Sequence, residues 1–382
     1  MLVGLDAIPL TEPRTGVGHY TFELARALAR AAPGEEFELA YPSAYPEIEF
    51  GEGERSSWPT NLRVARVRVG ALGRRWFAAG LPRYAARRRL GLFHGTNFEV
   101  PLWGRAARVL TIHDLSLLAL PGAHERRRVR RARRRLPLMA RAADAVITPT
   151  EFVRREACGL LGLAPAKVFA VHEAARALFR PLAFPETEEA RRRLGAGAEF
   201  LLAVGTIEPR KNLSLLVEAF EEVLRARPGS GLRLAVAGRR GWLDDALMAR
   251  LASSPARDRL VLTGYVADED LRALYSSCRA FVYPSVYEGF GLPPLEAMSC
   301  GAPVLAGRSG AVAEVAGGAA RLFDPASKEE LTRALLELLE DEAARQRLRE
   351  AGLRRASEFS WERTARLTLE VYAEARDRKS RQ

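Results

Sequence analysis

The 382-residue sequence is poor in the side chains that bind metals and form disulfides. It contains three cysteines and five histidines. Cys158, Cys278 and Cys300 stand alone, without the CxxC spacing of a zinc or redox site, and no histidines cluster with them. We interpret the cysteines as reduced, buried thiols, and we predict no metal site among them.

Long apolar runs are also missing. No stretch of 18 apolar residues occurs, which is the length that a transmembrane helix needs. The first ten residues, MLVGLDAIPL, have neither a basic leader nor a small-residue cleavage site. We therefore expect a cytosolic chain without a membrane span or a secretory signal.

Negative charge is scarce in the first half of the chain. Residues 1–180 contain 29 Lys and Arg against 17 Asp and Glu, whereas residues 181–382 contain 30 of each group. The whole formal excess of +12 therefore belongs to the first half. This asymmetry predicts that a partner with negative charge docks there.

What the sequence does have is a repeated rhythm of short apolar runs, each followed by a turn and a helical pattern. In the first half the runs are LVGLDAI, FELAY, LRVARVRV, GLFHG, RVLTIHD, AVITPT and KVFAVHE; in the second they are FLLAVGT, LRLAVAG, RLVLTGYV, RAFVYPS, PVLAG and RLFDP. Such runs are typical of strands covered on both faces. We predict two α/β domains with mostly parallel sheets, divided near Pro181, and a ligand cleft between them at the carboxyl ends of the strands.

The stretch EGFGLPPLEAMSCGAP, residues 288–303, follows a predicted strand and begins a predicted helix. Its glycines can expose backbone amides to a phosphate near the helix N-terminus. Because carboxylates repel phosphate, Glu288 on the loop and Glu296 in the first helical turn would instead accept hydrogen bonds from sugar hydroxyls. Alternatively, Glu296 only favours the helix dipole and Glu288 is a solvated loop residue.

The stretch VGTIEPRKNLSLLVEAF, residues 204–220, places two cations before a helix that Asn212 can cap. Arg210 and Lys211 beside free helix amides would suit the charges of a diphosphate. Solvated basic residues in an ordinary helix start are the alternative.

Three further motifs are weaker. Gly16 and Gly18 precede a helix after the first strand and could allow a ligand close to the backbone, but the full GxGxxG pattern of a dehydrogenase is absent. His113 and Asp114 end a buried strand on the expected cleft side, although a core histidine would look the same. The acidic triplet at 268–270 matches the Asp-x-Asp of some metal-binding enzymes, and a helix cap explains it better.

Taken together and in this order, the motifs resemble those of the retaining glycosyltransferases of family 4, which have the GT-B fold. The stretches that carry the resemblance are TGVGHYTFEL, TIHDLS, VGTIEPRKNL, TGYVADEDLRALYSSCRAFVYPSVYEGFGLPPLEAMSCGAPV and FSWERTARLTLEVY. The resemblance implies two Rossmann-like domains facing each other across a cleft. Residues 1–180 would bind the acceptor, residues 181–358 would bind the donor, and residues 359–382 would form a helix crossing back to the first domain.

The resemblance also implies roles for individual residues. Glu296 would hold the nucleotide ribose, Glu288 would contact the donor sugar, and Arg210 with Lys211 would bind the diphosphate. His113 would sit near the reacting carbon, and no metal would be required. The other residues implied to contact the donor are Gly16, Gly18, Tyr265, Val266, Gly289, Phe290 and Gly291.

The expected reaction is transfer of a hexose, with mannose from GDP-mannose as the first choice, to a glycan or lipid-linked acceptor. A UDP-sugar or dTDP-rhamnose donor, and an epimerase or phosphorylase of the same fold, are alternatives. Arginine-rich residues 125–135, and residues 74–90 with their aromatic rings, could bind an anionic membrane surface or only be solvated. Nucleic-acid binding through the basic half is a further alternative, but it leaves the neutral half unexplained.

Overall fold

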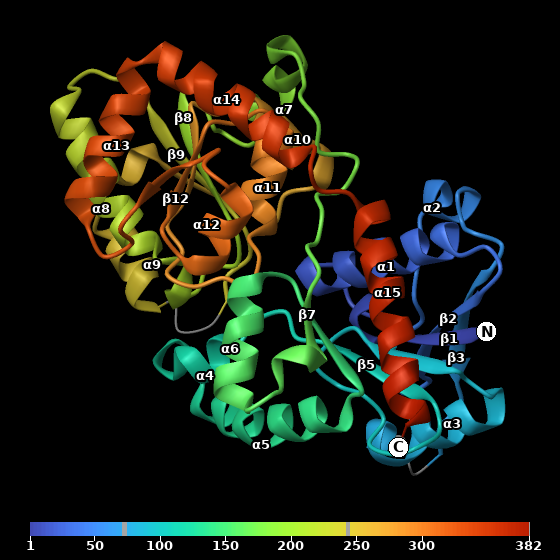
Figure 1. Ribbon diagram of the computed structural model, residues 1–382. Coiled ribbons are helices and arrows are strands. Elements are labelled where there is room, and N and C mark those ends of the chain that lie inside the picture. Colours follow the sequence, from blue (N-terminus) through green and yellow to red (C-terminus); the bar gives the residue numbers. More distant parts are fainter. Residues whose placement is uncertain (71–74, 242–244, 382) are drawn as a thin grey trace. The chain divides into compact units, whose positions relative to one another are not determined.

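The computed structural model describes residues 1–70, 75–241 and 245–381, and the chain divides into two compact units (Figure 1). Unit 1 comprises Met1–Ala119, Arg127–Ala174 and Ser360–Gln382. Unit 2 comprises Leu120–Arg126 and Ala175–Phe359.

Unit 1 is built on a seven-stranded parallel sheet with the order β3-β2-β1-β4-β5-β6-β7. Because β1 lies beside β4, the winding reverses between these two strands, as it does in a doubly wound fold. The strands are β1 Leu2–Asp6, β2 Glu36–Pro42, β3 Leu62–Val67, β4 Leu92–Gly95, β5 Ala107–Thr111, β6 Ala145–Thr148 and β7 Val168–Ala170. The helices are α1 Gly16–Ala31, α2 Glu52–Ser56, α3 Leu81–Arg88, α4 Ser116–Ala119, α5 Arg126–Ala142, α6 Glu151–Leu161 and α15 Trp361–Ser380.

The last helix, α15, belongs to unit 1, although the whole of unit 2 separates it from the rest of that unit in sequence. It packs against α1 and strands β5 and β6. Its Tyr372 hydroxyl lies 2.8 Å from Nδ1 of His94 on β4, and its Thr364 hydroxyl donates to the carbonyl of His172 at 2.7 Å. Burial lowers the pKa of His94 to about 3, so this histidine is neutral. Two contacts between uncharged polar groups therefore help to attach the last helix to the rest of unit 1.

Unit 2 contains a six-stranded parallel sheet with the order β10-β9-β8-β11-β12-β13. Its winding reverses between β8 and β11. The strands are β8 Phe200–Val204, β9 Arg233–Ala237, β10 Leu260–Gly264, β11 Ala280–Tyr283, β12 Val304–Gly307 and β13 Arg321–Phe323. The helices are α7 Glu188–Arg193, α8 Leu213–Ala226, α9 Asp245–Ala252, α10 Asp268–Ser277, α11 Leu292–Ser299, α12 Gly310–Ala316, α13 Lys328–Glu340 and α14 Glu342–Ala356.

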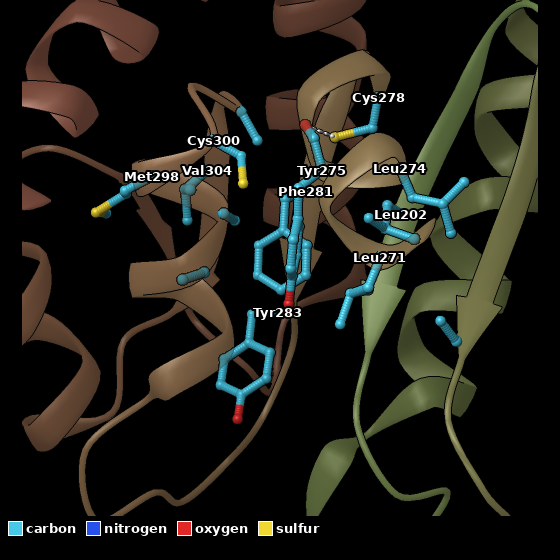
Figure 2. Close-up of a cluster of buried hydrophobic side chains, with 14 of the residues drawn as sticks. Leu202, Leu271, Leu274, Tyr275, Cys278, Phe281, Tyr283, Met298, Cys300 and Val304 are labelled. Carbon is cyan, nitrogen blue, oxygen red and sulfur yellow. Dashed lines mark hydrogen bonds between the residues drawn. The ribbon is translucent and has the colours of Figure 1, made fainter. Parts of the chain in front are cut away.

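Aromatic side chains fill the core on one face of the unit 2 sheet (Figure 2). The ring of Phe281 lies 5.4 Å from that of Tyr275 and 5.9 Å from that of Tyr283. Figure 2 shows Tyr283 at one end of the cluster, with its hydroxyl directed away from the other labelled side chains. Tyr283 therefore connects the packed interior to the carboxyl edge of the sheet.

The predicted fold is confirmed: two parallel sheets with helices follow the predicted order of strands. One helix boundary and the exposure of one cysteine differ from the sequence prediction. Helix α10 begins at Asp268, three residues before the predicted start at Leu271. Cys278 and Cys300 are buried thiols, but Cys158 is partly exposed. Among the described residues, no helix combines the length and the apolar character required to cross a membrane.

Candidate active site

The reversal point between β8 and β11 brings two of the predicted segments together in unit 2. The chain leaves β8 toward Lys211, and it leaves β11 toward Glu288. Because all strands are parallel, both segments emerge at the carboxyl edge of the sheet, where doubly wound folds bind their ligands.

Lys211 and Glu288 form a buried ion pair at this edge. The Lys211 ammonium donates to Glu288 Oε1 at 2.6 Å and to the Tyr283 hydroxyl at 2.8 Å. Lys211 is 9% exposed and Glu288 is 7% exposed. Burial alone would raise the pKa of Glu288, but the charges of Lys211 and Arg210 lower it to about 2. Burial lowers the pKa of Lys211.

Arg210 joins a second glutamate to the pair. Its guanidinium donates to Glu288 Oε2 at 2.8 Å and to the Tyr287 carbonyl at 3.1 Å, and its Nε lies 2.6 Å from Oε1 of Glu208. Glu208 is only 2% exposed. Two cations and two carboxylates therefore balance one another, so Arg210 and Lys211 are not the solvated basic residues of the alternative interpretation.

The backbone after β8 is shaped to hold these side chains. Gly205 has a φ of 145°, and a Cβ there would lie 3.3 Å from Cε of Lys211, so the missing side chain leaves space for the lysine stem. Asn212 stands at the N-cap position of α8, but the predicted side-chain cap is wrong. Its amide instead donates to the carbonyls of Pro284 at 3.3 Å and Pro325 at 2.8 Å, which ties the loops after β8, β11 and β13 together.

The segment after β11 turns into helix α11 at Gly291, whose φ of 100° favours glycine. Phe290 is 5% exposed and its ring packs 6.0 Å from that of Phe359, so the side chain beside Gly289 faces the core. Glu296 was expected in the first turn of this helix. It is the fifth residue of α11, and no acidic residue occupies the first turn, so interaction with the helix dipole does not explain Glu296.

Glu296 is a buried carboxylate with partners of its own. The Tyr275 hydroxyl donates to it at 3.4 Å, and a guanidinium nitrogen of Arg176 lies 3.7 Å away. Burial raises the pKa of Glu296 to about 7, although Arg176 opposes the shift. The pKa values of the two glutamates in the stretch 288–296 are thus shifted in opposite directions.

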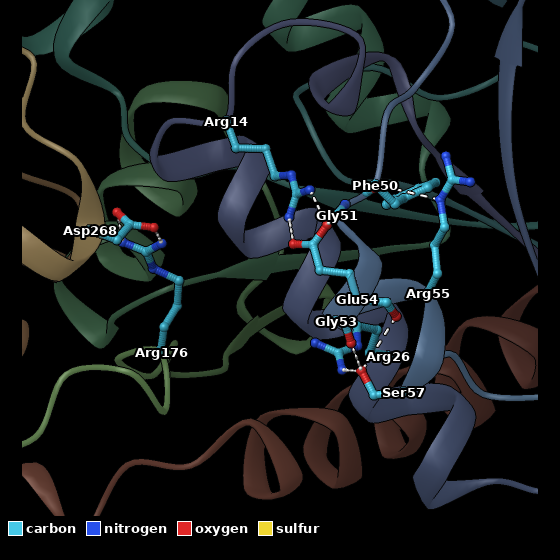
Figure 3. Close-up of polar contacts among 10 residues, drawn as sticks. All are labelled: Arg14, Arg26, Phe50, Gly51, Gly53, Glu54, Arg55, Ser57, Arg176 and Asp268. Atoms are coloured by element: carbon cyan, nitrogen blue, oxygen red, sulfur yellow. Dashed lines mark hydrogen bonds and ion pairs between the residues drawn. The ribbon is translucent and has the colours of Figure 1, made fainter.

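Arg176 also bridges Glu296 to α10 through a bidentate ion pair with Asp268 (Figure 3), in which one of the two hydrogen bonds measures 2.9 Å. Asp268 begins the acidic triplet that sequence reasoning explained as a cap. The N-cap residue is Ala267, and Asp268 and Asp270 pair with Arg176 and Arg193. The triplet therefore lies in the first turn of α10 and does not cap the helix, and its two aspartates form ion pairs with arginines.

Tyr265 and Val266, predicted to border the nucleotide base, follow β10 and differ in exposure. The Tyr265 side chain is 58% exposed, whereas Val266 is 7% exposed and belongs to the core. The guanidinium of Arg239, which follows β9, lies over the Tyr265 ring at 4.6 Å from its centroid.

In unit 1, His113 follows β5 and both of its ring nitrogens face oxygen atoms. Nε2 lies 2.7 Å from the Thr96 carbonyl, and Nδ1 lies 3.2 Å from Oε1 of Glu173, which is 5% exposed. The edges of the Tyr20 and Phe98 rings contact the imidazole. Both ring nitrogens of His113 are therefore occupied by contacts within unit 1.

The two predicted glycines of unit 1 differ from each other. A Cβ on Gly16 would meet no atom within 4 Å, whereas a Cβ on Gly18 would lie 3.0 Å from the Pro9 carbonyl oxygen. Close packing against Pro9 therefore explains why position 18 is a glycine. Of the two glycines, only Gly16 has open space where a side chain would be. Arg14, which precedes them, is held by Glu54 of α2 through hydrogen bonds of 2.5 and 2.6 Å (Figure 3).

The structure thus brings Arg210, Lys211 and Glu288 into direct contact, and it places Glu296 with a separate set of partners in the same unit. His113, Gly16 and Gly18 lie in unit 1. Sequence reasoning missed Glu208, Arg176 and Glu173, which pair with predicted residues. Glu208 lies within the quoted EPRKN motif and could have been noticed there, whereas no sequence pattern points to the other two. Within the described residues, no group of three or more His, Cys, Asp or Glu side chains could hold a metal.

Two doubly wound units, one with an ion-pair cluster at its reversal point, define a two-domain α/β protein of the Rossmann type. Two family models match it: "Glycosyltransferase Family 4" over residues 14–174 and "Glycosyl transferases group 1" over residues 186–355. O-antigen chain mannosyltransferase B of Escherichia coli is 32% identical over 373 residues, which are 95% of this chain and 97% of that protein. The chain therefore belongs to the glycosyltransferases of family 4, with the GT-B fold.

Two further comparisons extend this result. Serotype-specific mannosyltransferase WbdA of Escherichia coli is 37% identical over 178 residues, which are 46% of this chain and 22% of that longer protein. The crystal structure of Anabaena HepE in complex with UDP and glucose has a TM-score of 0.74 and 18% identity, and the match covers 97% of this chain and 99% of that one. At this identity the structural match supports the fold alone.

Proposed function

We propose that this glycosyltransferase transfers mannose from GDP-mannose, with retention of the anomeric configuration, to a glycan or lipid-linked acceptor of a cell-surface polysaccharide. The observation that carries the proposal is the buried contact of Glu288 with both Lys211 and Arg210 at the reversal point of unit 2. These residue types can serve the two ends of a sugar diphosphate, because cations bind phosphates and a carboxylate accepts from sugar hydroxyls.

The roles follow from this chemistry. Breaking the anomeric bond leaves negative charge on the diphosphate, which Arg210 and Lys211 would stabilise. Glu288, held ionised, would accept from donor sugar hydroxyls, and Glu296 would accept from the ribose. Amides of residues 289–291 would line the sugar and phosphate. We assign no enzymatic nucleophile, because the departing phosphate can itself accept the proton of the acceptor hydroxyl.

Mannose is preferred as the transferred sugar because both relatives described above are mannosyltransferases. The neighbour with bound UDP and glucose shares only the fold, so it favours a UDP-sugar weakly. Donor identity can be tested by a thermal-shift panel of GDP-mannose, UDP-glucose, dTDP-rhamnose and ADP-glucose, because a donor that binds the folded state raises its unfolding temperature. Stabilisation by a UDP-sugar or dTDP-rhamnose alone would replace the GDP-mannose proposal.

Transfer itself needs a separate assay. Purified enzyme with GDP-mannose and mannose oligosaccharides should yield an extended glycan whose new linkage has the α configuration of the donor by NMR. An inverted linkage would refute the retaining mechanism. An epimerised nucleotide sugar as the product would instead indicate an epimerase. Cleavage that requires inorganic phosphate would indicate a phosphorylase.

We also propose that no metal is required. Transfer should continue at an unchanged rate after treatment with EDTA and passage through a desalting column. Loss of activity that Mg²⁺ or Mn²⁺ restores would contradict this part of the proposal.

We propose that the arginines of helix α5 bind an anionic membrane surface on the cytoplasmic side, where a lipid-linked acceptor would lie. Seven of the eight arginines at 126–135 are exposed, and Glu99 pairs with Arg135 at 2.8 Å and Arg131 at 3.8 Å. The segment 74–90 suits a membrane less well: Trp76 is 4% exposed, the Tyr84 hydroxyl donates to Glu38, and Arg74 lies outside the described residues. Sedimentation with anionic vesicles should detect binding that salt weakens. If the protein does not bind the vesicles at low salt, the membrane proposal is refuted. If it binds DNA and not the vesicles, a nucleic-acid partner is favoured.

A further inference from the structure

Two side chains at the carboxyl edge of the unit 2 sheet form a pair that is still unassigned. Arg239 follows β9 and Tyr265 follows β10, and these strands are neighbours on one side of β8. Both side chains are exposed, and the Arg239 guanidinium lies 4.6 Å from the centroid of the Tyr265 ring. They therefore stand at the same sheet edge as Lys211 and Glu288.

The charge of Arg239 is not committed to an acidic partner. In the part of the chain that the structure describes, Arg239 forms no ion pair, whereas the neighbouring Arg240 lies 3.5 Å from Asp245. Stacking on an aromatic ring fixes the plane of a guanidinium and leaves its N–H groups directed outward within that plane. Such a group can donate two parallel hydrogen bonds to a planar ligand.

The chain connects this pair to the expected ribose site. Tyr265 precedes Asp268 by three residues, which limits the separation of their Cα atoms to about 11 Å. Asp268 holds Arg176, and Arg176 lies 3.7 Å from Glu296. The Arg239–Tyr265 pair and the partners of Glu296 therefore both involve the connection between β10 and α10.

We propose that Arg239, oriented by Tyr265, determines donor specificity by reading guanine. The inference rests on the proposed function, and it adds the base that the donor site selects. Guanine presents two neighbouring acceptors, O6 and N7, to an arginine fork. Adenine presents N7 beside an amino donor, and the two carbonyls of uracil are separated by an N–H donor, so neither base offers two neighbouring acceptors to both N–H groups.

Calorimetric titration of the whole protein with GDP, UDP, ADP and 7-deaza-GDP tests this assignment. GDP should bind about 10- to 100-fold more tightly than UDP or ADP, which is the discrimination expected of one bidentate arginine contact. 7-Deaza-GDP keeps O6 but lacks N7, so it should lose most of this advantage. Equal binding of GDP and 7-deaza-GDP would overturn the two-bond contact.

Arg239→Met and Arg239→Lys separate the fork from its charge. Both variants should lower the affinity for GDP about 10- to 100-fold and leave that for UDP within about twofold, because lysine keeps the charge without the planar fork. Arg240→Met is the matched control: it removes a neighbouring positive charge and should leave the ratio of GDP to UDP affinity unchanged.

The outcomes distinguish this inference from the proposed function. If Arg239→Met weakens GDP and UDP equally, Arg239 serves the phosphates, and its assignment to the base is overturned. If the wild-type protein binds GDP and UDP equally, the base assignment fails while the diphosphate site stands. If no nucleoside diphosphate binds, the donor site itself is wrong, and the inference is overturned with it.

Discussion

The two glutamates of the stretch 288–296 should affect stability with opposite pH dependence. Glu288 has a pKa lowered to about 2 and Glu296 has a pKa raised to about 7, both from an ordinary value of 4.5. The variants Glu288→Gln and Glu296→Gln remove one charge each while keeping similar side-chain volumes. Both residues lie in unit 2, so the same unfolding transition should report on both.

For Glu288, the folded state favours the ionised form. A fall of about 2.5 in pKa corresponds to about 3 kcal/mol of stability. This contribution is complete above pH 4.5 and is lost as the pH falls toward 2. At neutral pH, Glu288→Gln leaves Lys211 buried without its closest carboxylate; breaking a buried pair in this way costs about 3–5 kcal/mol, and this figure includes the contribution from the pKa shift.

For Glu296, the sign is reversed because the folded state favours the protonated form. Below about pH 4.5 the carboxyl is protonated in the folded and the unfolded state, so the pKa shift does not lower the free energy of unfolding. As the pH rises from 5 to 7, the carboxyl ionises in the unfolded chain and stays protonated in the folded state, so the wild type loses about 2–3 kcal/mol of stability and no more above pH 7. Glu296→Gln does not ionise, so its stability relative to wild type should rise by that amount across the same range.

Urea unfolding followed by circular dichroism at pH 5, 6, 7 and 8 measures the difference for Glu296, and the same measurement at pH 3 and 4 covers the loss expected for Glu288. Glu269→Gln, which changes an exposed glutamate of α10, is the control and should stay within about 0.5 kcal/mol of wild type at every pH. Two results would refute the reasoning. One is a Glu288→Gln protein as stable as wild type at pH 7, and the other is a Glu296→Gln difference that does not change with pH.

Three other substitutions test neighbouring parts of the structure. Lys211→Met should reduce transfer by at least about 100-fold, measured as kcat/KM, because a diphosphate cation is removed; unchanged kinetics would place the diphosphate elsewhere. Gly205→Ala should destabilise by about 1–3 kcal/mol in urea, since its φ of 145° strains any side chain; a neutral effect would contradict this. Tyr372→Phe leaves His94 without one partner and should lower stability by about 1–3 kcal/mol, measured by thermal unfolding; an unchanged unfolding temperature would contradict this.

The fold was predictable because both signals that define it are local. Apolar runs mark buried strands and helical patterns mark the connections, so the strand order along the chain could be read directly. The start of α10 was missed by three residues because Asp268, Glu269 and Asp270 were interpreted as a cap, whereas they form the first turn. Acidic residues are favourable in either position, and the extended backbone of Ala267, which occupies the N-cap position, distinguishes the two.

The candidate site was predictable only in part. Arg210, Lys211 and Glu288 belong to local motifs, and the parallel sheet necessarily brings the ends of neighbouring strands together. Contacts between segments that are distant in the sequence could not be predicted from it. Arg176 reaches Asp268 across 92 residues of sequence, and Glu173 lies 60 residues from His113. The role of Asn212 was misjudged for the same reason, since its amide bonds Pro325 rather than its own helix.

The neutral ion-pair cluster changes what donor binding has to do. Lys211 can donate three hydrogen bonds, and Glu288 and Tyr283 already receive two of them. A diphosphate that takes a share of Lys211 and Arg210 would weaken their hold on Glu288, whose carboxylate could then accept hydroxyls of the sugar. Recognition of phosphate and sugar would be coupled through one carboxylate. Only the complete donor uses the released carboxylate. Replacing Glu288 by glutamine should therefore favour the nucleoside diphosphate over the nucleotide sugar, so the ratio of the two affinities should be lower in wild type than in Glu288→Gln.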